Sequence, residues 1–208
     1  MEPINLTADA EEFTCNVYLV EGEATTLVDA GTMPGVADAA AERVDDLDRV
    51  VLTHQHGDHV GELDAVLDRF DAELYAYGDH PRRDVALRDG DEVLVGDEPC
   101  EVVYTPGHAA DHVSLLGPDR LYSGDVVVYN DGAFSDGSFG RTDMAGQSRE
   151  RLIESLHALL ERLPDSTCAM FPGHGDVYDE REGNESLRAV LERATTRAER
   201  RDPKYPDE

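Results

Sequence analysis

Four apolar runs of this chain each end in a loop that carries histidine or aspartate. The densest loop, THQHGDH, follows the run Val50–Leu52 and places His54, His56, Asp58 and His59 within six residues. Three later runs end in the segments TPGH, YSGD and FPGH. Scaffolds that combine strands with helices carry functional side chains on the loops at strand ends. This pattern therefore constrains the chain most strongly, and it predicts an α/β fold.

The spacing of apolar residues predicts the same class. Short apolar runs indicate strands, and apolar residues at three- and four-residue steps indicate helices. No low-complexity linker divides the chain, so we expect one domain over residues 1–208, with a core at 16–177 and a frayed tail at 201–208. The predicted helices are Pro34–Leu47, Val60–Phe70, Arg149–Leu163 and Asn184–Arg200, and the predicted strands are Asn16–Val20, Thr25–Asp29, Arg49–Thr53, Glu73–Tyr77, Glu92–Val95, Cys100–Thr105, His112–Leu116, Arg120–Ser123 and Thr167–Phe171.

The charge of the chain is unusual, because 46 acidic residues against 18 basic ones give a net charge of −28. Disorder is excluded because apolar runs recur between turn signals. The acidic residues are spread along the whole chain and do not form a terminal tail. We therefore expect a globular protein with an acidic surface, adapted to salt that screens its self-repulsion.

The same charge bears on the partners and the compartment. No basic tract could neutralise the phosphates of a nucleic acid, and no apolar run is long enough to span a membrane. The first residues lack the pattern of a secretory signal, so a cytoplasmic protein is expected. Cys15, Cys100 and Cys168 are far apart, which is typical of buried, reduced thiols.

The strand-end loops together supply five histidines and two aspartates as possible metal ligands. Imidazole and carboxylate form the ligand set of Zn, Fe or Mn. Seven ligands are too many for one tetrahedral ion, but they suit two ions that share one carboxylate. The seven are His54, His56, Asp58, His59, His108, Asp125 and His174.

The motifs THQHGDH, PGH, SGD and PGHG, in this order, resemble those of the metallo-β-lactamase-fold superfamily over roughly Asn16 to Val177. The resemblance implies an αββα sandwich of two mixed sheets flanked by helices, with two divalent metal ions, most simply Zn2+, at one edge. It implies a first metal on His54, His56 and His108, a second on Asp58, His59 and His174, and Asp125 as the bridge. Asp29 would support the site, and His112 would be structural. His80 and His157 lie outside the motifs and are interpreted as surface histidines.

The ligand set also predicts a mechanism. Two ions ~3.5–4 Å apart can hold a hydroxide as the nucleophile at neutral pH, which makes a separate serine or cysteine unnecessary. Asp58 is the expected catalytic residue, because its carboxylate can orient the hydroxide or accept its proton.

Among the branches of the superfamily, the segment GRTDM at Gly140–Met144 resembles that of glyoxalase-II-like thioesterases and of persulfide dioxygenases. The resemblance implies a zinc-dependent thioesterase that cleaves a small acyl thioester. The first alternative is a mononuclear iron persulfide dioxygenase that uses His54, His108 and Asp125. A lactonase or other hydrolase of this fold remains open, whereas a nuclease is disfavoured by the charge. Arg141 could pair with a substrate carboxylate or form a structural salt bridge.

Overall fold

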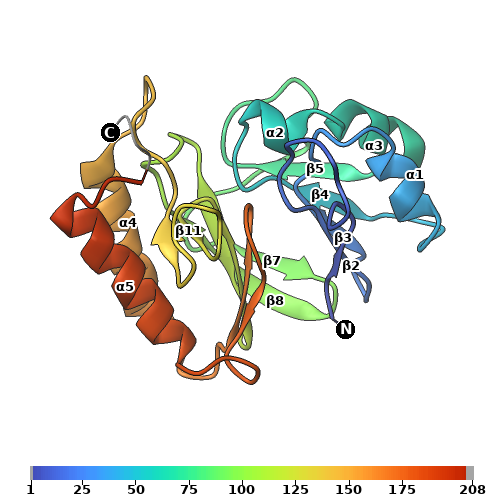
Figure 1. Cartoon of the computed structure of the whole chain (residues 1–208). Coiled ribbons are helices and arrows are strands. Elements are labelled where there is room, and N and C mark those ends of the chain that lie inside the picture. Colours follow the sequence, from blue (N-terminus) through green and yellow to red (C-terminus); the bar gives the residue numbers. More distant parts are fainter. Residues whose placement is uncertain (1, 205–208) are drawn as a thin grey trace. The chain divides into compact units, whose positions relative to one another are not determined.

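The structure is a computed structural model that describes residues 2–204. Its chain forms two compact units, which divide between Val102 and Val103 (Figure 1). Each unit combines a mixed β-sheet with helices, so the predicted α/β class with two mixed sheets and flanking helices is confirmed. That the chain forms a single domain stays a prediction. No helix within residues 2–204 has the length and apolar character needed to cross a membrane.

The first unit contains a six-stranded sheet in the order β1-β2-β3-β4-β5-β6 and the antiparallel pair of β7 and β8. The strands β1 to β3 pair antiparallel, and β3 to β6 pair parallel. Parallel neighbours matter here because their carboxyl ends meet at one edge of the sheet. The strands are β1 (Ile4–Asn5), β2 (Tyr18–Val20), β3 (Thr26–Val28), β4 (Arg49–Val51), β5 (Glu73–Ala76), β6 (Val85–Ala86), β7 (Glu92–Val95) and β8 (Glu98–Tyr104).

Helix α1 (Val36–Ala41) is shorter than the predicted helix Pro34–Leu47. Its N-cap is Gly35, whose φ of 92° lies in the left-handed region that glycine adopts at little cost. The helical backbone therefore cannot begin at Pro34. The prediction was wrong at both ends. The apolar residues Val44 and Leu47, whose spacing suggested a longer helix, lie in the turn and irregular segment after α1.

The predicted helix Val60–Phe70 is divided into α2 (Gly57–Val60) and α3 (Leu63–Phe70). The break occurs because the Glu62 N–H donates to the Gly31 carbonyl (2.9 Å) and not within a helix. Periodicity alone could not show this, because the acceptor lies thirty-one residues away along the chain.

The core of the first unit lies between its sheet and α1 and α3. Val50 and Leu74 from the sheet and Leu52 just after β4 are buried, and Val36 and Val66 from the helices pack into the same cluster. Burying a side chain of this size completely contributes about 1.5–3 kcal/mol. This packing fixes β3 and β4, the two strands that lead into the histidine-rich loop.

The second unit contains the strand order β14-β13-β10-β9, and the chain enters it through the end of β8. Strand β10 pairs parallel with β13 and antiparallel with β9, while β11 and β12 form a separate ribbon. Its elements are β9 (Val113–Leu116), β10 (Arg120–Gly124), β11 (Val127–Val128), β12 (Ser138–Phe139), α4 (Arg149–Arg162), β13 (Ala169–Pro172), β14 (Tyr178–Asp179) and α5 (Leu187–Arg200).

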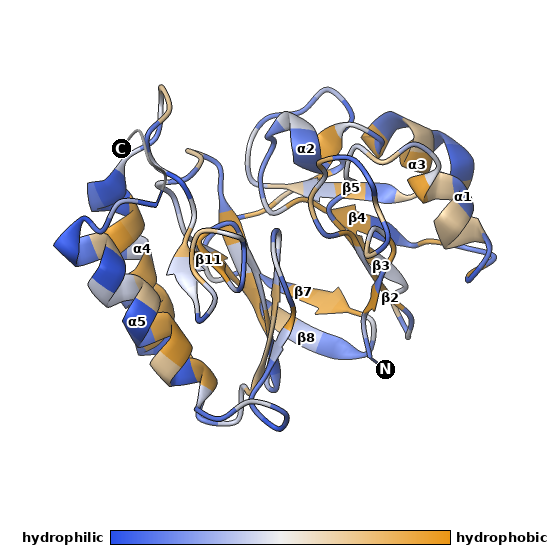
Figure 2. Ribbon diagram, viewed as in Figure 1, coloured by the Kyte–Doolittle hydropathy of each residue, from blue (hydrophilic) through white to orange (hydrophobic). Residues whose placement is uncertain are grey.

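Helices α4 and α5 begin at serine caps and pack against each other. The Ser148 and Ser186 hydroxyls accept from backbone N–H groups three residues later, which satisfies donors at each helix start. Figure 2 shows an apolar stripe along α5 and hydrophilic residues on its other side. Leu152 and Leu156 of α4 and Leu191 of α5 are buried in one cluster with residues of the sheet.

The predicted frayed tail at 201–208 is wrong for its first part. The structure describes residues 201–204, and Lys204 there is buried and bonded. Residues 205–208, the rest of the predicted tail, lie outside the described residues.

Candidate metal centre

In the first unit, the histidine-rich loop is positioned by the parallel strands β3 and β4. The Asp29 N–H, just after β3, donates to the carbonyl of Val51 at the end of β4 (3.0 Å). The Asp29 carboxylate then accepts from the Thr53 N–H and from the Thr53 hydroxyl, both at 2.8 Å. The start of the loop is therefore fixed by a buried carboxylate on the neighbouring strand end.

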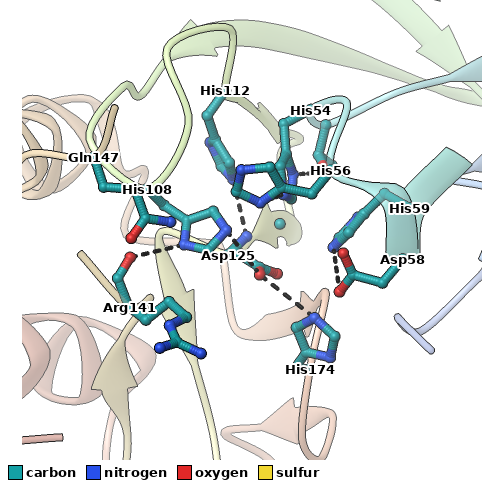
Figure 3. Close-up of polar contacts among 12 residues, drawn as sticks. His54, His56, Asp58, His59, His108, His112, Asp125, Arg141, Gln147 and His174 are labelled. Atoms are coloured by element: carbon teal, nitrogen blue, oxygen red, sulfur yellow. Dashed lines mark hydrogen bonds and ion pairs between the residues drawn. The ribbon is translucent and has the colours of Figure 1, made fainter. Parts of the chain in front are cut away.

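The same carboxylate orients His59. Its Nδ1 lies 2.8 Å from Asp29 Oδ2, and both side chains are almost fully buried. Because a carboxylate only accepts, Nδ1 carries the proton and Nε2 keeps its lone pair. That Nε2 lies 3.9 Å from Asp58 Oδ2 (Figure 3). His59 therefore presents Nε2, a candidate ligand nitrogen, on the side of Asp58.

His54 is oriented by Thr53 in a similar way. The Thr53 hydroxyl gives its only proton to Asp29, so its oxygen accepts from His54 Nδ1 at 3.1 Å. The lone pair of His54 Nε2 then points towards His56 Nδ1, which lies 3.1 Å away. Two nitrogens bound to one tetrahedral Zn2+ at ~2.0–2.1 Å would lie about 3.3–3.4 Å apart, so this pair fits one ion.

In the second unit, Asp125 and His174 follow neighbouring parallel strands, β10 and β13. The Gly173 N–H donates to the Gly124 carbonyl (2.9 Å), so the residues that come next lie side by side. His174 Nε2 lies 3.5 Å from Asp125 Oδ2. The register of the sheet, which the sequence does not show, thus brings these two predicted ligands together.

His108 reaches the same carboxylate from the turn after β8. Its Nε2 lies 3.3 Å from Asp125 Oδ2, while its Nδ1 donates to the Arg141 carbonyl (2.9 Å), as Figure 3 shows. The turn is held by α4, because a Cβ on Gly107 would lie 2.4 Å from the backbone nitrogen of Leu152. One oxygen of Asp125 therefore lies beside two imidazole nitrogens, at distances that suit ligands of metal ions.

His112 is structural, as the sequence predicts. Its Nε2 accepts from the Asp125 N–H (2.9 Å), and its Nδ1 therefore donates to the Thr105 hydroxyl (2.8 Å). Both ring nitrogens are used, so the ring holds the backbone of Asp125. The other two histidines also agree with the prediction, since His80 accepts from a backbone N–H in a loop and His157 pairs with Glu199 at the surface.

Arg141 forms a salt bridge within its own loop. Its guanidinium makes two contacts with Asp143, at 2.8 and 2.7 Å, and this bond holds the pKa of the Asp143 carboxyl below its usual range. Of the two roles that the sequence left open for Arg141, the structure therefore shows the salt bridge.

Sequence reasoning missed two groups that orient the ligands: the hydroxyl of Thr53 and the carbonyl of Arg141. The role of Thr53 could have been suspected from the sequence, because a threonine stands at the start of both histidine motifs. Thr53 precedes His54, and Thr105 begins TPGH and hydrogen-bonds His112. A backbone carbonyl has no signal in the sequence, because every residue carries one.

The donor set of each unit thus suits a divalent metal. The first unit gathers His54, His56, Asp58 and His59, and the second gathers His108, Asp125 and His174. Imidazoles with one nitrogen fixed by an acceptor are typical of metal ligands, because the hydrogen bond fixes the tautomer and orients the second nitrogen.

Comparison with known proteins agrees with this chemistry. Residues 10–174 match the Metallo-beta-lactamase superfamily. The chain is 31% identical over 163 residues to the probable metallo-hydrolase YqgX of Bacillus subtilis (strain 168), a match that covers 66% of this chain and 74% of YqgX. The crystal structure of ETHE1 from Myxococcus xanthus is similar with a TM-score of 0.73 and 27% identity, covering 100% of this chain and 94% of ETHE1.

Hydroxyacylglutathione hydrolases are also similar. The chain is 32% identical over 166 residues to the enzyme of Aeromonas hydrophila subsp. hydrophila, a match that covers 73% of this chain but 58% of that enzyme. The chain thus spans little more than half the length of this relative. From the matched family and the metal-binding chemistry of its residues, the chain belongs to the metallo-beta-lactamase superfamily, whose proteins bind divalent metals.

Proposed function

We propose that the chain is a dinuclear zinc hydrolase that cleaves a small acyl thioester. The observation that carries the proposal is the place of Asp125, whose Oδ2 lies 3.3 Å from His108 Nε2 and 3.5 Å from His174 Nε2. A carboxylate shared by two imidazoles of different metal sites is what a bridging ligand requires. The similarity to hydroxyacylglutathione hydrolases supports the thioester as the substrate class.

In this proposal, all seven predicted ligands serve the two ions. The first ion takes His54, His56 and His108, and the second takes Asp58, His59 and His174, with Asp125 between them. Imidazole nitrogen and carboxylate oxygen suit Zn2+, while Fe and Mn accept the same donors. The thiol that carries the acyl group is small, but glutathione itself is not assigned, because the match spans 58% of the similar glutathione-dependent enzyme.

When bound, the two ions activate water at neutral pH and polarise the substrate carbonyl. The residues of the chain supply the rest of the chemistry. In this proposal the Asp58 carboxylate, which is about one-fifth exposed, orients the attacking water and accepts its proton. Asp29 holds His59 through Nδ1 and so fixes the tautomer of the neutral ring in which Nε2 carries the lone pair.

The second candidate is a mononuclear iron persulfide dioxygenase that uses His54, His108 and Asp125. The similarity to ETHE1 over the whole chain favours it. In that reading His174 is dispensable for metal binding. The two candidates therefore predict different effects on metal binding when the imidazole of His174 is removed.

The substitution His174→Ala tests the proposal. It removes a ligand of the second ion, so the metal content should fall from two ions per chain to about one. Hydrolysis of the thioester should fall by orders of magnitude, because the second ion would contribute to activating the water and to polarising the substrate. Metal content is measured by elemental analysis and activity with acyl thioesters of small thiols.

The matched control is His157→Ala, which removes an exposed histidine of the same unit that pairs with Glu199. Metal content and activity should not change in this variant. Oxygen consumption with a persulfide, present in the parent protein and retained in the His174→Ala variant, would overturn the hydrolase proposal in favour of the dioxygenase.

A further inference from the structure

The only lysine of the chain, Lys204, is buried in the second unit. Its ammonium lies 2.7 Å from Asp131 Oδ2 and also donates to the carbonyl of Phe139. Both side chains of the ion pair are almost fully buried. A buried charge of this kind is retained only when it is paired and hydrogen-bonded, as it is here. Removing one partner would leave the other uncompensated.

The two groups held by Lys204 are the two ends of one loop. Asp131 begins the segment 131–140, and Phe139 lies at its end in strand β12. Three glycines make this segment intrinsically flexible. One ammonium that contacts both ends therefore closes the loop at its base.

Helix α5 holds the middle of the same loop through two arginines. Arg193 donates to the carbonyl of Asp136 (2.6 Å), and Arg197 donates to the carbonyl of Gly137. Arg197 also pairs with the Asp136 carboxylate at 2.9 Å. In a chain with 18 basic residues, three cations from α5 and the following segment thus converge on this loop.

The end of the loop leads directly into the candidate metal ligands of the second unit. A Cβ on Gly140 would lie 1.8 Å from the carbonyl oxygen of Asp125, so the backbone passes Asp125 without room for a side chain. The next residue, Arg141, accepts the hydrogen bond from His108 Nδ1 (2.9 Å). The position of Phe139 therefore fixes the position of the carbonyl that orients His108.

We propose that Lys204 is a positioning residue for the metal ligand His108. By closing the 131–140 loop it keeps the Arg141 carbonyl on His108 Nδ1, which holds His108 Nε2 ready for the metal. The inference rests on the proposed metal centre, although not on the identity of the substrate. It gives the C-terminal end of the described chain a role at a ligand more than ninety residues earlier.

The test uses Lys204→Met, which removes the ammonium but keeps most of the side-chain length. The full-length protein is stripped of metal with a chelator and titrated with Co2+ in high salt, and binding is followed by visible absorption. We expect at least one binding step to weaken by about 10-fold or more, the effect typical of losing a group that orients a metal ligand. The absorption spectrum of the bound Co2+ should change, and Lys204→Arg should restore part of the affinity.

The matched control is Arg200→Met, which removes an exposed cation of α5 in the same unit. Its Co2+ affinity and spectrum should equal those of the parent protein. If Lys204→Met does not fold, Asp131→Asn carries the test, because it weakens the same ion pair and leaves the amine in place.

Two results separate the proposals. A parent protein that binds no Co2+ would overturn the metal centre itself. A parent protein that binds Co2+, with variants at Lys204 or Asp131 that bind it with the same affinity and spectrum, would overturn the role of Lys204 alone.

Discussion

At the scale of single residues, Asp29 shows how the site is held. It is one of four described non-glycine residues with positive φ, at 61°, and it is almost fully buried. A left-handed backbone is uncommon outside glycine, although aspartate tolerates it better than most residues. Glycine would fit the backbone but would lose the carboxylate that fixes Thr53 and His59. The side chain therefore outweighs the backbone preference at this position.

Asp125 is the residue whose loss should damage the centre most. Asp125→Ala removes the proposed bridge, whose negative charge offsets the repulsion between two dications. We expect both metal ions to be lost or bound far more weakly, and activity to be abolished, as measured by elemental analysis and thioester hydrolysis.

The control for this variant is Asp165→Ala, which removes a fully exposed carboxylate of the same unit. It should keep two metal ions. An Asp125→Ala protein that binds two ions with near-parent activity would show that the bridge is assigned to the wrong residue.

At the scale of elements, the contact between α5 and the 131–140 loop is electrostatic. The Arg193 side chain donates to Glu185, and the Arg197 side chain donates to Asp136. These bonds hold the pKa values of both carboxyls below their usual range. Only Asp136 belongs to the loop, so the loop is held through the pairs of Arg193 and Arg197 with Asp136, whereas Glu185 directly precedes the N-cap of α5.

The pair of Arg193 with Glu185 predicts how stability depends on pH. Because the pKa of Glu185 is lower in the folded chain than in the unfolded chain, its contribution is complete above the unfolded pKa and is lost as the pH falls through the folded value. Glu185→Gln should lower the free energy of unfolding of the metal-free protein near neutral pH by no more than about 1 kcal/mol. The difference from the parent protein should shrink below a pH of about 4.

Urea unfolding at a series of pH values measures this difference. Glu192→Gln, at an exposed glutamate of the same helix, should show no such pH dependence. A Glu185→Gln penalty that stays constant down to acidic pH would mean that the pair with Arg193 does not stabilise the fold.

At the scale of the whole molecule, the net charge of −28 is the dominant property. Repulsion among 46 carboxylates is offset by only 18 cations, and several arginines are already paired, such as Arg82 with Asp64 and Asp68. Salt screens such repulsion with a Debye length of about 10 Å at 0.1 M and about 3 Å at 1 M. Stability should therefore rise with salt.

Thermal unfolding in low and in molar KCl tests this expectation. The melting temperature should increase with KCl, whereas sucrose, which is uncharged, should not reproduce the full increase because it does not screen charge. A melting temperature that does not change with KCl would remove the basis for the prediction of salt adaptation, without affecting the metal centre.

Local chemistry in the sequence was sufficient to predict the class of fold, most of the longer elements and the seven candidate ligands. Helix α4 agrees with its prediction to within one residue, because a serine cap and a regular apolar stripe are both local signals. The candidate ligands were visible because histidine and aspartate follow four apolar runs, and loops at strand ends are where such scaffolds carry functional side chains. Strands of two residues, such as β11 and β14, were missed. They are defined by their pairing with another strand, and two residues are too few to show a hydrophobic period.

Only the tertiary structure decided which groups orient the ligands. The carbonyl of Arg141, the hydroxyl of Thr53 and the ammonium of Lys204 each act on partners that the register of strands or the path of a loop brings near. The sequence also predicted a frayed end where Lys204 is buried. A side chain carries its chemistry in its own identity, whereas a hydrogen-bond partner exists only once distant segments meet, and the energy that brings them together is spread over the whole core.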